Sequence, residues 1–143
     1  MRVAQISVFL ENRTGRLAEV TGILSEAGIN IRALAVADTS DFGILRLIVD
    51  NNDKTEKALK DNGFSVGKTN VVAVEVEDKP GGLHRILSLL TAAGINVEYM
   101  YSMVISRNNN AVMIFRFDNT DNALKVLESN GIPVINGSLV HGM

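Results

Sequence analysis

An internal repeat constrains the fold of this chain more than any other feature of its sequence. The stretch Glu11-Asn12-Arg13-Thr14-Gly15-Arg16-Leu17 returns 66 positions later as Glu77-Asp78-Lys79-Pro80-Gly81-Gly82-Leu83, and Gly28-Ile29-Asn30-Ile31 returns at the same offset as Gly94-Ile95-Asn96-Val97. A repeat of this length indicates two similar supersecondary modules. We expect one module over residues 1–68 and the other over 69–143.

The apolar pattern within each copy predicts a fixed order of elements. Alternating apolar residues indicate strands, and apolar residues at helical spacing indicate helices. In the first copy the pattern predicts strand, helix, strand, strand, helix and strand, over 3–10, 17–27, 29–35, 45–49, 53–62 and 64–66. The second copy, whose first strand opens at Val72, has a longer hairpin, since Asp118 follows its counterpart Asp50 by 68 positions.

The order βαββαβ is that of the ferredoxin-like motif, in which helices cover one face of an antiparallel sheet. The sequence therefore predicts an α+β protein of two ferredoxin-like modules with antiparallel sheets, packed together because a module this small has a marginal core. For the tail 136–143 two expectations stay open, an edge strand or a frayed end.

Composition excludes several classes of protein. Hydrophobic residues make up 46% of the 143 residues and charged residues 21%, which is typical of a folded globular chain. The formal charge is −2 with Lys and Arg spread along the sequence, so we expect no nucleic-acid partner. The chain has no cysteine and two histidines without grouped carboxylates, which predicts no disulfide and no metal site.

The start of the sequence lacks the apolar run of a secretory signal, and no stretch approaches the length needed to cross a bilayer. We therefore expect a cytoplasmic protein without a membrane partner.

The glycine turn before the first helix of each copy is the candidate binding edge. Glycine tolerates unusual backbone angles and allows close approach to the main chain. The first N–H groups of the helix behind it have no intrahelical partner and attract an anion such as a carboxylate. The alternative interpretation is structural, with Gly15 and Gly81 as turns that merely begin helices and with Asn30 and Asn96 as turn residues.

These motifs resemble the ACT domain, a small regulatory module that binds amino acids. The resemblance is carried by Asp78-Lys79-Pro80-Gly81-Gly82-Leu83 with Ala93-Gly94-Ile95-Asn96-Val97, and again by 12–17 with 27–31. The two copies cover nearly the whole chain, so the resemblance implies a free-standing ACT pair that is not an enzyme and has no cofactor. Together with the duplication, it favours binding over the structural interpretation.

In ACT domains a free amino acid usually lies at an interface between two modules, held by main-chain groups of the turn and of the second strand. Carried over by position, the resemblance implies ligand-binding roles for Asn12, Arg13, Thr14, Gly15, Arg16, Leu17, Asn30, Ile31, Asp78, Lys79, Pro80, Gly81, Gly82, Leu83, Asn96 and Val97. The first copy departs from the family pattern, with Thr14 where proline is usual and Asn12 where aspartate is common. The second turn is therefore the stronger candidate. For Tyr99 and Tyr101 two roles stay open, a wall for a ligand side chain or for the module interface, or core packing.

The function expected from these features is non-catalytic and regulatory. We expect a homodimer that binds a free amino acid and transmits the occupancy of its site to a partner, which can be a metabolic enzyme. The alternative is an obligate regulatory subunit of an amino-acid biosynthetic enzyme. Ile6-Ser7-Val8-Phe9-Leu10-Glu11-Asn12 with Gly15-Arg16-Leu17 resembles the start of acetolactate synthase small subunits, although a second turn at this offset is not expected of them.

Overall fold

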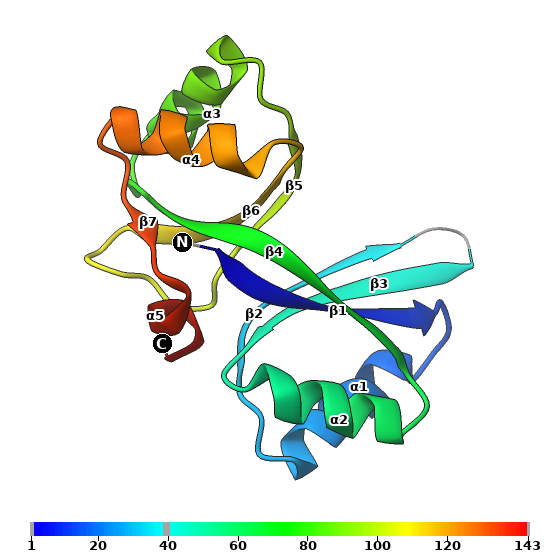
Figure 1. The fold of residues 1–143 in the computed structure, drawn as a ribbon. Coiled ribbons are helices and arrows are strands. Elements are labelled where there is room, and N and C mark those ends of the chain that lie inside the picture. Colours follow the sequence, from blue (N-terminus) through cyan, green and yellow to red (C-terminus); the bar gives the residue numbers. More distant parts are fainter. Residues whose placement is uncertain (1, 39–40, 143) are drawn as a thin grey trace. The chain divides into compact units, whose positions relative to one another are not determined.

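The computed structural model describes residues 2–38 and 41–142. The same succession of strands and helices occurs twice along the chain (Figure 1). In chain order the elements are β1 (Val3–Glu11), α1 (Arg16–Glu26), β2 (Ile31–Asp38), β3 (Phe42–Val49), α2 (Asn52–Asp61), β4 (Ser65–Val76), α3 (Gly82–Ala92), β5 (Val97–Ser102), β6 (Ala111–Phe117), α4 (Thr120–Ser129), β7 (Val134–Ile135) and α5 (Gly137–Gly142).

The chain divides into two compact units. Among the described residues, the N-terminal unit comprises 4–69 together with 141–142, and the C-terminal unit comprises 70–140 together with residues 2–3. In the N-terminal unit β3 pairs antiparallel with both β1 and β2. In the C-terminal unit β6 pairs antiparallel with β4 and β5, and β7 pairs antiparallel with β4.

In each unit two helices lie on one face of the sheet, α1 and α2 in the N-terminal unit and α3 and α4 in the C-terminal unit (Figure 1). This arrangement confirms the predicted α+β class and the two ferredoxin-like modules with antiparallel sheets.

Each unit has its own hydrophobic core between the sheet and its two helices, and the two cores are built from equivalent positions. Counterparts 66 positions apart include Ile6 and Val72, Val8 and Val74, Leu10 and Val76, Val20 and Ile86, and Leu24 and Leu90. Beyond the longer hairpin the offset becomes 68, as for Leu47 and Phe115, Val49 and Phe117, Leu59 and Leu127, and Phe64 and Ile132. The repeat in the sequence is therefore a repeat of core positions.

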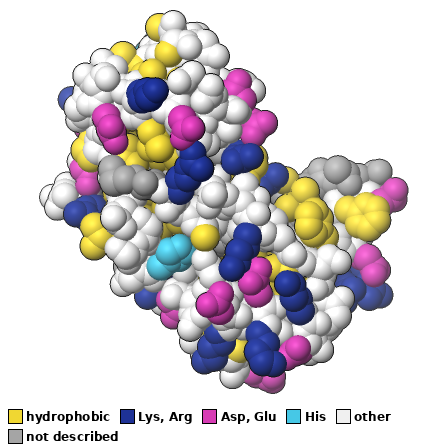
Figure 2. Space-filling view, in the orientation of Figure 1, with side chains coloured by type: hydrophobic (Ala, Val, Ile, Leu, Met, Phe, Trp, Pro, Cys, Tyr) yellow, Lys and Arg dark blue, Asp and Glu magenta, His cyan; other side chains and the backbone are white. Residues whose placement is uncertain are grey.

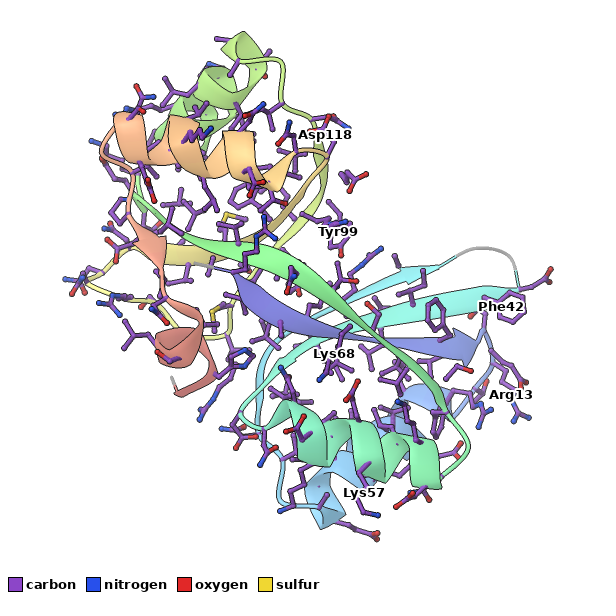
Figure 3. All side chains as sticks on the ribbon, in the orientation of Figure 1. Arg13, Phe42, Lys57, Lys68, Tyr99 and Asp118 are labelled. Carbon is purple, nitrogen blue, oxygen red and sulfur yellow. The ribbon has the colours of Figure 1, made fainter. Side chains whose placement is uncertain are left out.

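Strand β4 differs from the sequence prediction. A brief strand over 64–66 and a separate strand opening at Val72 were expected, but the backbone stays extended from Ser65 to Val76. The intervening residues 67–71 contain no proline and no paired turn residues, so nothing in them reverses the chain. Lys68, which Figure 3 labels, also lies near two carboxylates of α2, 3.2 Å from Glu56 Oε2 and 3.6 Å from Asp53 Oδ1. The last strand of the first copy and the first strand of the second are thus one strand.

The tail also differs from both expectations, because 137–142 form a short helix, α5. The side chain of Asn136 accepts a hydrogen bond from the backbone N–H of Ser138 at 2.9 Å and another from the Ser138 hydroxyl at 2.8 Å. Val140 is fully buried. A polar cap and one apolar anchor are local signals that favour a helical turn over a strand.

The described surface carries mixed charge. On the face drawn in Figure 2, side chains of Lys and Arg are interspersed with those of Asp and Glu, so this face presents no continuous basic patch among its described side chains. None of the helices within 2–38 and 41–142 is long and apolar enough to cross a membrane.

Candidate functional site

The two glycine turns have the same local geometry. Gly15 and Gly81 each occupy the position just before a helix with left-handed backbone angles, φ 89° and φ 85°, which favour glycine. Their carbonyls accept the first helical bonds, from the N–H groups of Glu19 and Arg85, each at 3.0 Å. Among the described residues, no side chain caps either helix start with a hydrogen bond. The N–H groups of Arg16 and Gly82 donate to the carbonyls of Arg13 and Lys79, at 3.4 and 3.1 Å, and the helix dipole places a partial positive charge at each helix start.

Gly82 fixes the shape of the second turn. A Cβ atom built on Gly82 would lie 2.1 Å from the carbonyl oxygen of Glu77, far inside the contact distance of two heavy atoms. The loop therefore folds tightly back over the start of α3, and only a residue without a side chain fits there.

A cavity of about 330 Å³ opens beside this turn, entirely within the C-terminal unit. Its walls come from the end of β4, the turn, the first residues of α3, the segment after α4 and one residue of the hairpin. They are Glu75, Glu77, Lys79, Pro80, Gly81, Gly82, Arg85, Ile86, Asn110, Gly131, Ile132 and Pro133. A space of this size accommodates a small molecule such as an amino acid.

Charges of both signs surround the cavity. Lys79 Nζ lies 2.6 Å from Glu77 Oε2. This hydrogen bond, reinforced by the charges of Lys79 and Arg85, holds the pKa of Glu77 below its ordinary value, so Glu77 is ionised at neutral pH. Glu75 accepts a hydrogen bond from the Asn110 amide at 3.2 Å and lies 3.6 Å from Arg107 Nε.

Arg85 differs from these groups because its guanidinium is weakly engaged. Its Nη2 donates to the carbonyl oxygen of Asn130 at 3.4 Å, and across 2–38 and 41–142 no carboxylate lies within ion-pair distance of it. A guanidinium beside the N-terminal end of a helix forms an electropositive corner suited to a carboxylate.

The structure brings together only part of the predicted second site. Lys79, Pro80, Gly81 and Gly82 line the cavity, whereas Asp78 and Leu83 do not. The predicted strand residues 96–97 follow the opposite end of α3, which spans 11 residues and thus about 16 Å.

The same separation holds in the N-terminal unit, where residues 12–17 precede α1 and residues 30–31 follow it. Within one unit, the turn and the start of the second strand lie at opposite ends of the helix, too far apart to contact the same small ligand. Tyr101 is buried, Tyr99, which Figure 3 labels, is partly buried, and neither lines the cavity, so at this site they form no wall.

Asn96 has a structural role in this fold. Its backbone N–H donates to the Asp118 carboxylate at 3.0 Å and its carbonyl accepts from the Asp118 N–H at 3.1 Å. Asn30 and Asp50 repeat both bonds at 3.1 and 3.2 Å. The Asn–Asp pair therefore ties the start of the second strand to the end of the third in both units.

Removal of this carboxylate should destabilise the C-terminal unit modestly. Asp118→Ala deletes the acceptor of the Asn96 N–H and should lower the free energy of unfolding by about 1 kcal/mol. Urea denaturation measures the change, with Asp118→Asn as the matched control because it keeps an acceptor oxygen (Figure 3). Equal losses in the two variants would show that the charge, and not the hydrogen bond, matters.

Several residues that line the cavity were not predicted from the sequence. Glu75, Arg85 and Ile86 flank the predicted turn, but nothing in the linear pattern separates them from ordinary strand and helix residues. Asn110 and 131–133 lie far away in sequence and reach the cavity only through the fold. The sequence contained one signal for this segment. Gly131 follows α4 with left-handed backbone angles, as Gly63 follows α2.

The fold and the paired glycine turns define a protein of two tandem ferredoxin-like modules with a candidate small-molecule site at a helix start. Residues 1–141 match the family model described as an ACT domain pair, and the chain belongs to this family. A protein of Bacteroides thetaiotaomicron known from its crystal structure is 43% identical with a TM-score of 0.92, over 100% of this chain and 98% of that one. The regulatory subunit of aspartate kinase from Thermus thermophilus, in its ligand-free form, shares the fold at 18% identity with a TM-score of 0.60, over 88% of this chain and 91% of that one.

Two curated relatives are similar over part of the chain. The acetolactate synthase small subunit of Buchnera aphidicola subsp. Baizongia pistaciae (strain Bp) is 35% identical over 77 residues, 52% of this chain and 47% of that protein. The acetolactate synthase isozyme 3 small subunit of Escherichia coli (strain K12) is 43% identical over 44 residues, 31% of this chain and 27% of that protein. The chain thus spans less than half the length of these relatives. Family membership and these similarities support a regulatory role.

Proposed function

We propose that this chain is a non-catalytic regulatory protein that binds a free amino acid in the cavity at the Gly81–Gly82 turn and transmits its occupancy to a partner enzyme. The observation that carries the proposal is the cavity of about 330 Å³, which combines the N-terminal end of α3, the Arg85 guanidinium, two carboxylates and an apolar wall. An α-amino acid carries complementary groups, namely a carboxylate, an ammonium and a side chain.

The carboxylate of the ligand would lie at the start of α3, where the helix dipole and Arg85 both favour negative charge. The ammonium would lie near Glu75 and Glu77. The remaining wall is formed by Ile86, Ile132 and Pro133, which suits an apolar side chain. These contacts favour an amino acid with an uncharged side chain.

Transmission requires that the ligand stabilise one arrangement of the protein over another. The cavity is suited to this, because its walls come from segments far apart in sequence, the turn at 79–82 and the segment 131–133. A ligand that contacts both segments would hold them at a fixed separation. The partner enzyme would sense that change.

A homodimer is the second part of the proposal. Asn96 and Val97 are separated from the turn of their own chain by the length of α3, so they would contribute to a ligand site only if another copy presents them. Strand β2 ends the sheet order and exposes the apolar side chains of Leu34 and Val36, a feature that favours pairing. Light scattering of the purified chain measures the oligomeric state, and a monomer at micromolar concentration would contradict this part.

A second candidate function is that of an obligate subunit of an amino-acid biosynthetic enzyme, acting through protein contacts alone. The similarity to acetolactate synthase small subunits favours it. In that case the protein would co-purify with a large enzyme and no amino acid would bind to it.

A thermal-shift screen with the common amino acids tests the proposed function. A ligand at a hundred times its dissociation constant adds about 2.7 kcal/mol, enough to raise the melting temperature by several degrees. The shift should be lost in Arg85→Gln and kept in Lys125→Gln, which removes an exposed cation of α4 in the same unit. If no amino acid raises the melting temperature, the sensor function is wrong.

A further inference from the structure

We infer that Arg16 fills, in the N-terminal unit, the space that remains open as the ligand cavity in the C-terminal unit. One consequence of the inference rests on the proposed function. If the chain binds an amino acid as proposed, each chain has a single amino-acid site, at the second turn. The first turn is then closed by its own side chain.

The repeat places the relevant residues at equivalent positions. Arg16 corresponds to Gly82, each being the first residue of the helix behind its turn. Gly63 and Gly131 end the second helix of their units in the left-handed region, and the residues that follow them, Phe64 and Ile132, bond back to equivalent leucine carbonyls, each at 3.0 Å.

The side chain of Arg16 contacts the counterparts of the residues that line the cavity. Its Nη1 donates to Glu19 at 2.8 Å, its Nη2 lies 3.4 Å from Glu11, and its guanidinium lies 5.0 Å from the centre of the Phe64 ring. The counterparts of these three partners are Arg85, Glu77 and Ile132, and all three line the cavity of the C-terminal unit. Arg16 thus contacts the counterparts of three residues that line the cavity, from the turn to the segment after the second helix.

Arg16 is also held tightly for an arginine at a surface turn. Its side chain is only 22% exposed, and its Nε is shielded from solvent without a hydrogen-bond partner in the described chain. Ion pairs to two carboxylates and stacking on an aromatic ring hold the guanidinium in place. The C-terminal unit cannot form such a plug, because a side chain on Gly82 would collide with the carbonyl oxygen of Glu77.

One charge around the two spaces changes sign in a way that fits this difference. In the N-terminal unit the guanidinium lies between Glu11 and Glu19, over an aromatic face, which is a cation site. In the C-terminal unit Arg85 replaces Glu19 and Ile132 replaces Phe64, so the cation now belongs to the wall. The open cavity therefore suits a ligand with a carboxylate, whereas the N-terminal space holds a guanidinium already.

Chemical rescue tests the plug without any knowledge of the amino-acid ligand. Arg16→Ala should lower the melting temperature and leave a guanidinium-sized space between Glu11, Glu19 and Phe64. Methylguanidinium chloride at millimolar concentration should then raise the melting temperature of this variant by roughly 3–6 °C, while methylammonium chloride should not. The wild type should show no such rise, and neither should the control Lys57→Ala, which removes an exposed ion-paired cation of α2 (Figure 3).

A second readout uses the unmodified protein. The Nε–H of Arg16 should give an NMR signal with slow solvent exchange and a ring-current shift that disappears in Phe64→Leu. Fast exchange of that proton, or equal effects of methylguanidinium on Arg16→Ala and Lys57→Ala, would overturn the inference. Because neither readout involves an amino acid, failure of the amino-acid screen leaves the plug standing, and failure of the rescue leaves the proposed function standing.

Discussion

Gly82→Ala is expected to destabilise the protein by about 3 kcal/mol and to abolish amino-acid binding at the second turn. The added Cβ would lie 2.1 Å from the carbonyl oxygen of Glu77. This oxygen belongs to the backbone, so the clash cannot be relieved by a side-chain rotation. The turn must open, and the cavity wall formed by Gly81 and Gly82 must move with it.

Gly22→Ala is the matched control for this substitution. Gly22 lies within α1, and a Cβ there meets no atom within 4 Å. Alanine is the better helix former, so Gly22→Ala should stabilise the protein by roughly 0.5–1 kcal/mol. Urea denaturation of both variants gives the two changes in the free energy of unfolding. Similar values of the same sign would mean that the loop does not fold back over α3 as described.

Phe115→Ala is expected to produce the largest loss of stability, about 3–5 kcal/mol. Phe115 is fully buried in the core of the C-terminal unit, and its ring stacks on that of Phe117 with centroids 5.5 Å apart. It pairs with Val72 of β4 and Met100 of β5 and therefore lies on a central strand. Truncation of its side chain leaves a cavity in the hydrophobic core beneath the middle of the sheet. The midpoint of urea unfolding should fall without a comparable change in slope.

Phe42→Ala serves as the control for the loss of an aromatic ring. Phe42 is 59% exposed at the start of β3, where Figure 3 labels it, and its truncation should cost less than about 1 kcal/mol. A loss for Phe115→Ala as small as that for Phe42→Ala would contradict the core position of the Phe115 ring.

Much of the fold could be predicted because its signals are local. Ile6, Val8 and Leu10 alternate in the sequence and lie on the covered face of β1, since side chains of a strand point to opposite faces in turn. Gly15 and Gly81 could be identified as turn residues because left-handed backbone angles favour glycine. The break between the strands 64–66 and 72–76 was predicted wrongly, because an extended backbone continues unless a turn signal stops it, and 67–71 contain no proline and no paired turn residues.

The candidate site was less predictable than the fold. The turn itself could be located from Pro80, Gly81 and Gly82, but the opposite wall at 131–133 comes from a segment about fifty positions away. Sequence reasoning grouped Asn96 with the turn, whereas the helix between them keeps the two apart within one unit. Spacing along a chain does not reveal which ends of two elements lie together.

The sequence by itself determined the duplication, the order of strands and helices and the two glycine turns, because periodicity and backbone preference are properties of neighbouring residues. Only the tertiary structure decided that one turn borders a cavity while the other is filled by Arg16, because that difference depends on which distant side chains, Phe64 or Ile132, close the space from the far side. Local preferences determine the secondary structure, and the packing of distant side chains determines where a cavity remains.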